Sequence, residues 1–122
     1  MRSAVSIVSG LMLLANLTHA EAASLAGTYQ AAGKNVDGSP YSGTAEIVAT
    51  SDTTCKISWQ TGASTSQGIC MRNGSSFAAS YALGTTIGLV VYQIKPDGTL
   101  EGLWTIAGKP GIGAETLTPV KQ

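Results

Sequence analysis

Charged residues are scarce in this sequence, and neither sign is in excess. They make up 11% of the chain, with seven basic and seven acidic side chains in 122 residues. A neutral chain without a basic stripe lacks the attraction that supplies nonspecific binding to nucleic acids. It also lacks the polybasic cluster that holds proteins on anionic membranes. We therefore expect no nucleic-acid partner.

Histidine is almost absent, because His19 is the only one and it lies in an N-terminal leader described below. Without histidine, the Ser-His-Asp and Cys-His nucleophilic sites are excluded. The sequence also contains no nucleophile elbow, phosphate-binding loop or Ca²⁺ loop motif. We therefore predict no catalytic residue, no cofactor and no metal site, and expect that the protein is not an enzyme.

One pair of carboxylates needs separate consideration. If the last hairpin turns around Gly108, Glu101 lies opposite Glu115, with side chains within about 5 Å of each other. Close carboxylate pairs perform acid–base chemistry in glycosidases. Like charges in direct opposition are unfavourable, however, and a slip of one residue abolishes the pairing. We expect a solvated rim or a basic partner such as Lys34 or Arg72.

Long apolar runs are confined to the N-terminus. Arg2 precedes the apolar segment 4–17, and small residues follow up to Ala23. That order is typical of a secretory signal peptide, and the apolar run is too short to span a bilayer. We therefore predict a cleaved signal peptide at residues 1–23, a single domain at 24–122, no membrane anchor, and a periplasmic or secreted location.

Cysteine is also rare, with only Cys55 and Cys70 in the chain. A metal site would need more ligands, and a redox pair would need closer spacing. In an oxidising compartment an even cysteine count favours a structural disulfide. We therefore predict a Cys55–Cys70 bridge, worth about 3 kcal/mol in the chain-entropy treatment of a loop of about 15 residues.

Alternation of apolar and polar residues recurs throughout the rest of the chain. In the run 54–60, Cys55, Ile57 and Trp59 share one face, which is the pattern of a half-buried strand. Asn-Gly and Asp-Gly pairs in the intervening segments favour tight hairpins. The predicted strands are 27–32, 41–50, 54–60, 67–71, 76–82, 86–94, 99–107 and 113–120.

The fold class predicted is all-β, an eight-stranded antiparallel meander that closes into an up-and-down barrel. Glycines inside the strands favour closure because they mark bends and barrel corners. A β-sandwich is the alternative, although its crossovers need longer connections than this chain provides. The strand glycines are Gly43, Gly68, Gly88, Gly102 and Gly113.

Three aromatic residues are candidates for facing a ligand. Trp59, Tyr81 and Trp104 each share a strand face with apolar neighbours. The interior of an eight-stranded barrel is either filled by such side chains or holds one small ligand. Filling of a tapered core is the simpler interpretation, and an interior pocket of a few hundred cubic ångströms would favour the ligand.

Several segments resemble a family of small exported bacterial domains, some of which are labelled fibronectin-binding proteins. The resemblance is carried by the runs 25–29, 35–43, 100–104 and 113–119. It implies adhesion to host matrix, but no residue matches a known fibronectin-recognition motif. More distantly, Gly27-Thr28-Tyr29 with later tryptophans is similar to avidin-type barrels, and the size, leader and disulfide are similar to periplasmic inhibitor barrels.

The expected function is therefore that of an exported, non-enzymatic binding module. Its partner is predicted to be an extracellular matrix or envelope protein, as the family resemblance implies. A small-ligand carrier that uses the barrel mouth is one alternative, and an inhibitor of an extracytoplasmic hydrolase is the other. The oligomeric state is left open.

Overall fold

The structure is a computed structural model that describes residues 25–121. The signal peptide predicted for residues 1–23 lies outside the described residues. Within residues 25–121, no helix is long and apolar enough to cross a membrane.

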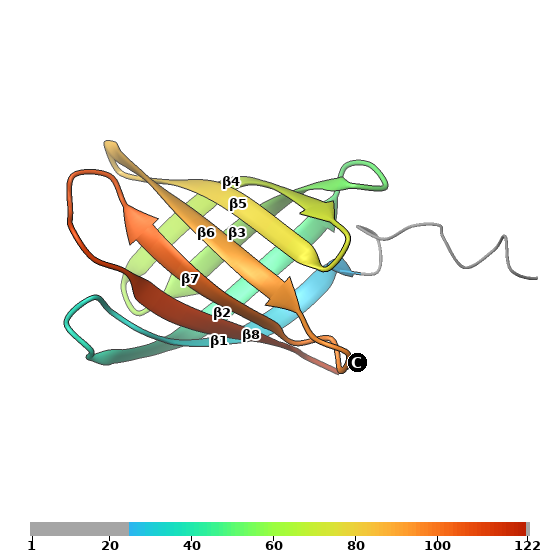
Figure 1. The fold of residues 1–122 in the computed structure, drawn as a ribbon, viewed down its shortest axis with the longest axis horizontal. Helices are drawn as coiled ribbons and strands as arrows, with labels where there is room; N and C mark the ends of the chain where they lie inside the picture. The colour runs from blue at the N-terminus through green and yellow to red at the C-terminus, as the bar shows by residue number, and fades with distance from the viewer. Residues whose placement is uncertain (1–24, 122) are drawn as a thin grey trace, which may run out of the picture.

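Eight antiparallel strands make up almost all of the described chain (Figure 1). Each follows one of the predicted alternating runs, with bounds that differ by at most three residues at either end. The strands are β1 (Gly27–Lys34), β2 (Pro40–Ala49), β3 (Thr54–Thr61), β4 (Ser64–Asn73), β5 (Ser76–Leu83), β6 (Thr86–Ile94), β7 (Leu100–Ile106) and β8 (Gly113–Pro119).

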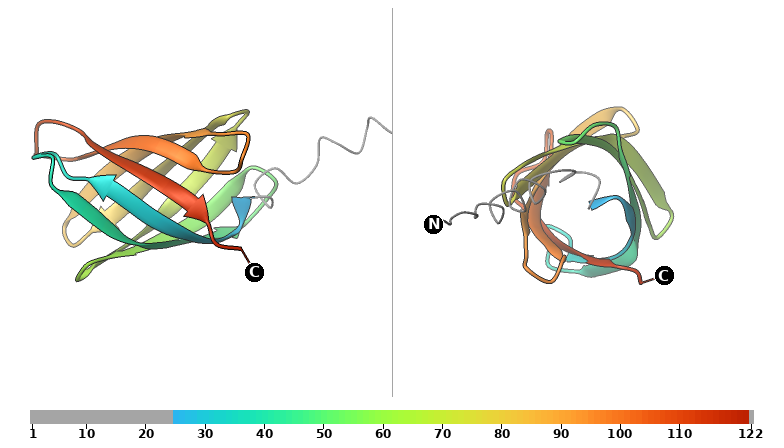
Figure 2. Two further views of the ribbon diagram at one scale, coloured as in Figure 1. Left: turned by 90° about the horizontal axis from the view of Figure 1, so that it is seen from below. Right: turned by 90° about the vertical axis from the view of Figure 1, so that its right-hand side faces the viewer.

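The sheet closes on itself, and each strand pairs with its neighbour in the sequence. Closure comes from β1 and β8, which pair from Tyr29↔Pro119 to Lys34↔Ala114. The end-on view in Figure 2 shows the resulting ring. Closure confirms the predicted barrel, and the sandwich alternative is wrong because a sandwich consists of two separate sheets.

Short turns connect the strands, and in two of them, β1–β2 and β6–β7, an aspartate side chain stabilises the reversal. Asp37 accepts hydrogen bonds from the backbone N–H and the hydroxyl of Ser39, at 2.9 and 2.6 Å. Asp97 does the same with Thr99, at 3.0 and 2.7 Å. These are Asx turns, in which a carboxylate satisfies nearby backbone donors. They lower the pKa of both aspartates, because the bonds favour the charged form.

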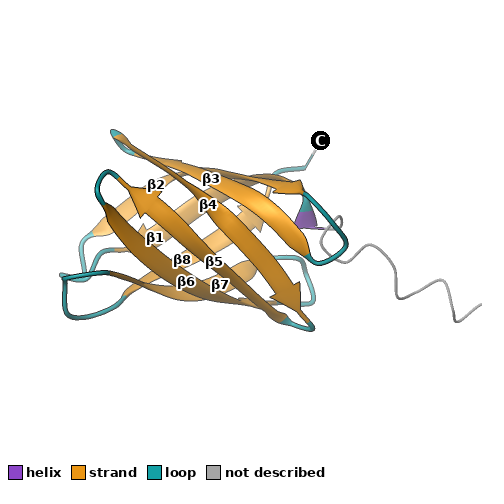
Figure 3. Cartoon of the chain, turned by 90° about the horizontal axis from the view of Figure 1, so that it is seen from above, coloured by secondary structure: helices purple, strands orange, loops and turns teal. Residues whose placement is uncertain are grey.

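The turns divide between two ends of the barrel, as the cartoon in Figure 3 shows. The β1–β2, β3–β4, β5–β6 and β7–β8 turns surround one end, which we call the mouth. The other three turns and both ends of the described chain surround the opposite end, which we call the base. The Tyr29 hydroxyl donates to the Leu25 carbonyl at 2.6 Å, which ties the start of the chain to the base.

Large apolar side chains fill the base half of the interior. They project from alternating positions of the strands, as the period of two requires. An eight-stranded barrel is just wide enough for such side chains to fill it. The most deeply buried of them are Ile47, Ile57, Phe77, Leu100 and Leu117.

The predicted disulfide is present between Cys55 and Cys70. The two residues are directly paired across β3 and β4, with their Cα atoms 4.9 Å apart. Within the described chain no free cysteine remains. Such a bridge is typical of proteins from non-reducing environments.

Candidate ligand-binding site

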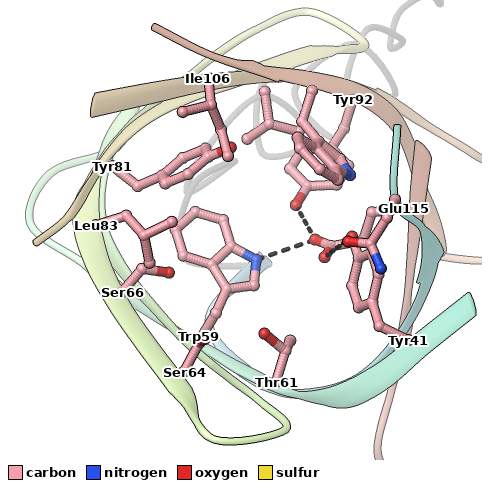
Figure 4. A pocket seen from close by; sticks show the side chains of 13 residues that line it. Tyr41, Trp59, Thr61, Ser64, Ser66, Tyr81, Leu83, Tyr92, Ile106 and Glu115 are labelled. Carbon is pink, nitrogen blue, oxygen red and sulfur yellow. Dashed lines mark hydrogen bonds between the residues drawn. The ribbon is translucent and has the colours of Figure 1, made fainter. Parts of the chain in front are cut away.

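A cavity of about 320 Å³ lies in the mouth half of the barrel. Its wall combines aromatic rings, apolar side chains, hydroxyl groups and one carboxylate (Figure 4). The residues that reach it come from seven strands, β2 to β8, and from the β1–β2 turn. They are Asn35, Tyr41, Trp59, Thr61, Ser64, Ser66, Tyr81, Leu83, Val90, Tyr92, Trp104, Ile106 and Glu115.

The three residues predicted to face a ligand all line this cavity. The rings of Trp59 and Tyr81 meet edge to face, with centroids 5.2 Å apart. Trp104 lies edge to face with Tyr41 at 6.3 Å. The aromatic residues therefore form walls around open space, and the interior of this half is not filled as the simpler interpretation expected.

Cross-strand glycines determine how these rings lie. Each of four interior aromatic residues is paired directly with a glycine of a neighbouring strand. A Cβ added at Gly88 would lie 2.2 Å from the Tyr81 ring, and one at Gly102 would lie 2.6 Å from the Tyr92 ring. The rings thus cover the neighbouring strand where a side chain is missing. The pairs are Gly33–Tyr41, Tyr81–Gly88, Tyr92–Gly102 and Trp104–Gly113.

Glu115 is the polar centre of the cavity. Its side chain projects inward from β8, and it is only 6% exposed. Oε1 accepts a hydrogen bond from the Tyr41 hydroxyl at 2.8 Å. Oε2 accepts from Trp59 Nε1 at 3.0 Å and from the Tyr92 hydroxyl at 2.5 Å (Figure 4). All three partners donate, which suits an acceptor-only carboxylate.

This geometry corrects the expectation for the last hairpin. Glu101 pairs with Thr116, whereas Glu115 pairs with Gly102. The pairing of the two strands is therefore shifted by one residue from the expected register, and the two carboxylates face opposite sides of the sheet. Glu101 points outward and forms a salt bridge with Lys95 at 3.7 Å. The prediction of a solvated rim was wrong for Glu115, which is buried.

The tyrosines around Glu115 are held in their protonated form. Burial, reinforced by the nearby carboxylate of Glu115, raises the pKa of Tyr92 well above its usual value. The same two causes raise the pKa of Tyr41, and they raise the pKa of Tyr81 to about 12. These hydroxyl groups therefore remain hydrogen-bond donors at neutral pH.

Most donors on the aromatic wall are already used by the protein. Besides the three that bind Glu115, Tyr81 donates to the Thr105 carbonyl and Trp104 Nε1 to the Ala114 carbonyl, both at 3.3 Å. No group of His, Cys, Asp and Glu within residues 25–121 is arranged to hold a metal ion. The site therefore offers an aromatic and apolar enclosure with one carboxylate and a few neutral polar groups, those of Asn35, Thr61, Ser64 and Ser66.

Sequence reasoning missed the role of Glu115, Tyr41 and Tyr92. The signal was present in β8, where Gly113, Glu115 and Leu117 share one face. Placing the apolar Leu117 inside places Glu115 inside as well, because residues two apart share a face of a strand. A carboxylate on an apolar face requires donors, and tyrosine and tryptophan supply them.

No family model and no curated protein matches this chain. Among solved structures, a redesigned β-barrel is similar with a TM-score of 0.74 and 17% identity, covering 85% of this chain and 98% of that one. Another redesigned barrel, mFAP1 bound to DFHBI, has a TM-score of 0.71 and 19% identity, covering 81% and 98%. The fatty acid transporter REP1-NXSQ has a TM-score of 0.53 and 12% identity, covering 82% and 98%. At these identities the likeness shows the barrel fold.

Proposed function

We propose that this protein is an exported small-ligand-binding barrel, periplasmic or secreted, that holds its ligand in the cavity at the mouth. The observation that carries the proposal is the enclosure itself. Its volume of about 320 Å³ and its aromatic wall fall within the usual range for small-molecule sites, which combine apolar walls with a few polar groups. The single buried carboxylate supplies the polar group that orients a ligand.

The similar structures support the same proposal. One of them binds DFHBI and another is described as a fatty acid transporter. Proteins of this fold therefore include ones that are described as binding or carrying small molecules. The matrix-binding function implied by the family resemblance receives no such support.

The test compares a variant that fills the cavity with one that leaves it open. Ser66 faces the cavity beside Trp59, whereas the neighbouring Thr65 points outward. Ser66→Phe places a ring in the cavity, and Thr65→Phe adds the same ring outside. Binding of 2-phenylethylamine, 2-phenylethanol and phenylacetate is measured by saturation-transfer NMR. We expect at least one probe to bind the unmodified protein and Thr65→Phe, and binding to be lost in Ser66→Phe. Absence of binding, or equal binding to both variants, would overturn the proposal.

A second candidate function is binding of a matrix or envelope protein, and one observation favours it. Met71, Ala78, Val91 and Leu103 form a continuous outward row across β4 to β7. Val91 is 58% exposed, and contiguous exposed apolar groups often mark protein interaction sites. Further exposed apolar residues adjoin this row on the same strands; they are Ile69, Ile87 and Leu89.

Immobilised fibronectin tests this second candidate. If the second candidate is right, the unmodified protein binds fibronectin saturably in surface plasmon resonance, and the Val91→Lys variant does not bind. Thr116→Lys is the control, because Thr116 lies opposite the outward-facing Glu101 on another part of the barrel. Absence of binding, or equal binding of both variants, counts against the second candidate and leaves the cavity proposal untouched.

A further inference from the structure

The buried carboxylate has no positive charge beside it in the cavity. Glu115 is the one charged residue buried among residues 25–121. None of the described residues that line the cavity is lysine or arginine. Buried charges in proteins are normally paired or strongly hydrogen-bonded. Three donors bind Glu115, but all of them are formally neutral groups.

The hydrogen-bonding capacity of Glu115 is also incomplete. An ionised carboxylate offers about four acceptor positions, two on each oxygen. Oε2 uses two of them, for Trp59 and Tyr92, while Oε1 uses one, for Tyr41. One acceptor position on Oε1 therefore remains for a donor that enters the cavity.

The wall of the cavity favours a cation over an anion. The faces of aromatic rings attract positively charged groups, and aromatic residues Tyr41, Trp59, Tyr81 and Trp104 surround the space. An anion would meet the charge of Glu115. It would also find that the donors of the aromatic wall are occupied by protein acceptors.

The size of the cavity limits the ligand. Its volume is about 320 Å³. At about 30 Å³ for each water-sized group, that volume holds about ten non-hydrogen atoms. A compact arylalkylamine such as 2-phenylethylamine is of this size.

From these observations we propose that the cavity binds a small organic cation, a protonated primary amine on a compact aromatic or aliphatic body, with Glu115 as its counter-charge. This inference rests on the proposed ligand-binding function and names its ligand class. The ammonium group donates to Glu115 Oε1, and the apolar body lies against Trp59 and Trp104.

The test uses three probes with the same phenyl ring and different head groups, at neutral pH. They are 2-phenylethylamine, 2-phenylethanol and phenylacetate, titrated into the purified, oxidised protein by calorimetry. We expect the amine to bind about tenfold more tightly than the alcohol, a factor typical of one additional charged hydrogen bond. Phenylacetate should show no binding.

Two variants test whether Glu115 causes the preference for the amine over the alcohol. Glu115→Gln keeps the shape and removes the charge, so the amine should lose its preference while the alcohol still binds. Glu101→Gln removes an outward-facing carboxylate paired with Lys95, and it should leave the amine preference unchanged.

The outcomes separate this inference from the proposed function. If the alcohol or phenylacetate binds the unmodified protein as tightly as the amine, the cation inference is overturned and the cavity remains a ligand site. The same holds if Glu101→Gln and Glu115→Gln have equal effects. If no probe binds, both proposals fail. The comparison of head groups needs only the unmodified protein, so it stands even where Glu115→Gln does not fold.

Discussion

Removal of one hydroxyl group from the cavity should have a large and specific effect on stability. Tyr92 is completely buried, and its hydroxyl donates to Glu115 Oε2 at 2.5 Å. Hydrogen bonds to charged groups contribute about 1.5–3 kcal/mol, roughly twice the value for neutral pairs. Tyr92→Phe keeps the ring over Gly102 and removes only this bond. We therefore expect the free energy of unfolding to fall by about 2 kcal/mol.

Tyr81→Phe is the matched control. Tyr81 is also an inward tyrosine over a glycine, but its hydroxyl donates to the Thr105 carbonyl, at 3.3 Å. This neutral bond should contribute about 0.5–1 kcal/mol. Urea unfolding at neutral pH measures both changes, and thermal melting should separate the variants by about 5–10 °C for a domain of this size. If Tyr92→Phe costs no more than Tyr81→Phe, the argument that Glu115 depends on charged hydrogen bonds is refuted.

Three further changes test other parts of the structure. Gly102→Ala should lower the free energy of unfolding by about 1–3 kcal/mol, as is usual for overpacking, because the new Cβ would lie 2.6 Å from the Tyr92 ring. If urea unfolding is unchanged in this variant, the Tyr92 ring does not lie over Gly102. Removing the Cys55–Cys70 bridge by a double serine substitution should cost about 2–5 kcal/mol, and thiol labelling of the native, oxidised protein at either cysteine would show that the bridge does not form. The free energy of unfolding should also fall at high pH. Folding raises the pKa of Tyr81 to about 12 and raises the pKa of Tyr92 well above its usual value. The stabilisation that these two tyrosines provide is therefore complete below the unfolded tyrosine pKa of about 10, and it is lost progressively as the pH rises above that value. A flat profile of unfolding free energy in alkaline urea titrations would contradict this burial.

The fold could be predicted from the sequence because the patterns that indicate strands and turns are local. Alternation in a run such as 54–60 reports which face is buried, and Asp-Gly turns report where the chain reverses. The Cys55–Cys70 pairing followed in the same way, because the Gly62 turn lies midway between the two cysteines.

The site could be predicted only in part, because it depends on the register between strands. A shift of one residue in the β7–β8 hairpin moved Glu115 from an expected rim position to the interior. Alternation identified Trp59, Tyr81 and Trp104 as inward residues, but it does not report whether the space between them is filled. That depends on where glycines such as Gly88 and Gly113 face the rings across the sheet, which only the assembled barrel determines.

Two indole N–H signals provide the most direct test of the proposed site, because the chain contains two tryptophans and both line the cavity. Trp104→Phe assigns them in a proton–nitrogen NMR spectrum of the unmodified protein. On titration with 2-phenylethylamine, both indole signals should shift saturably, while the backbone amides of the outward-facing Leu89 and Val91 stay in place. Shifts confined to the outward face of β4 to β7, with both indole signals unmoved, would contradict a ligand site inside the barrel.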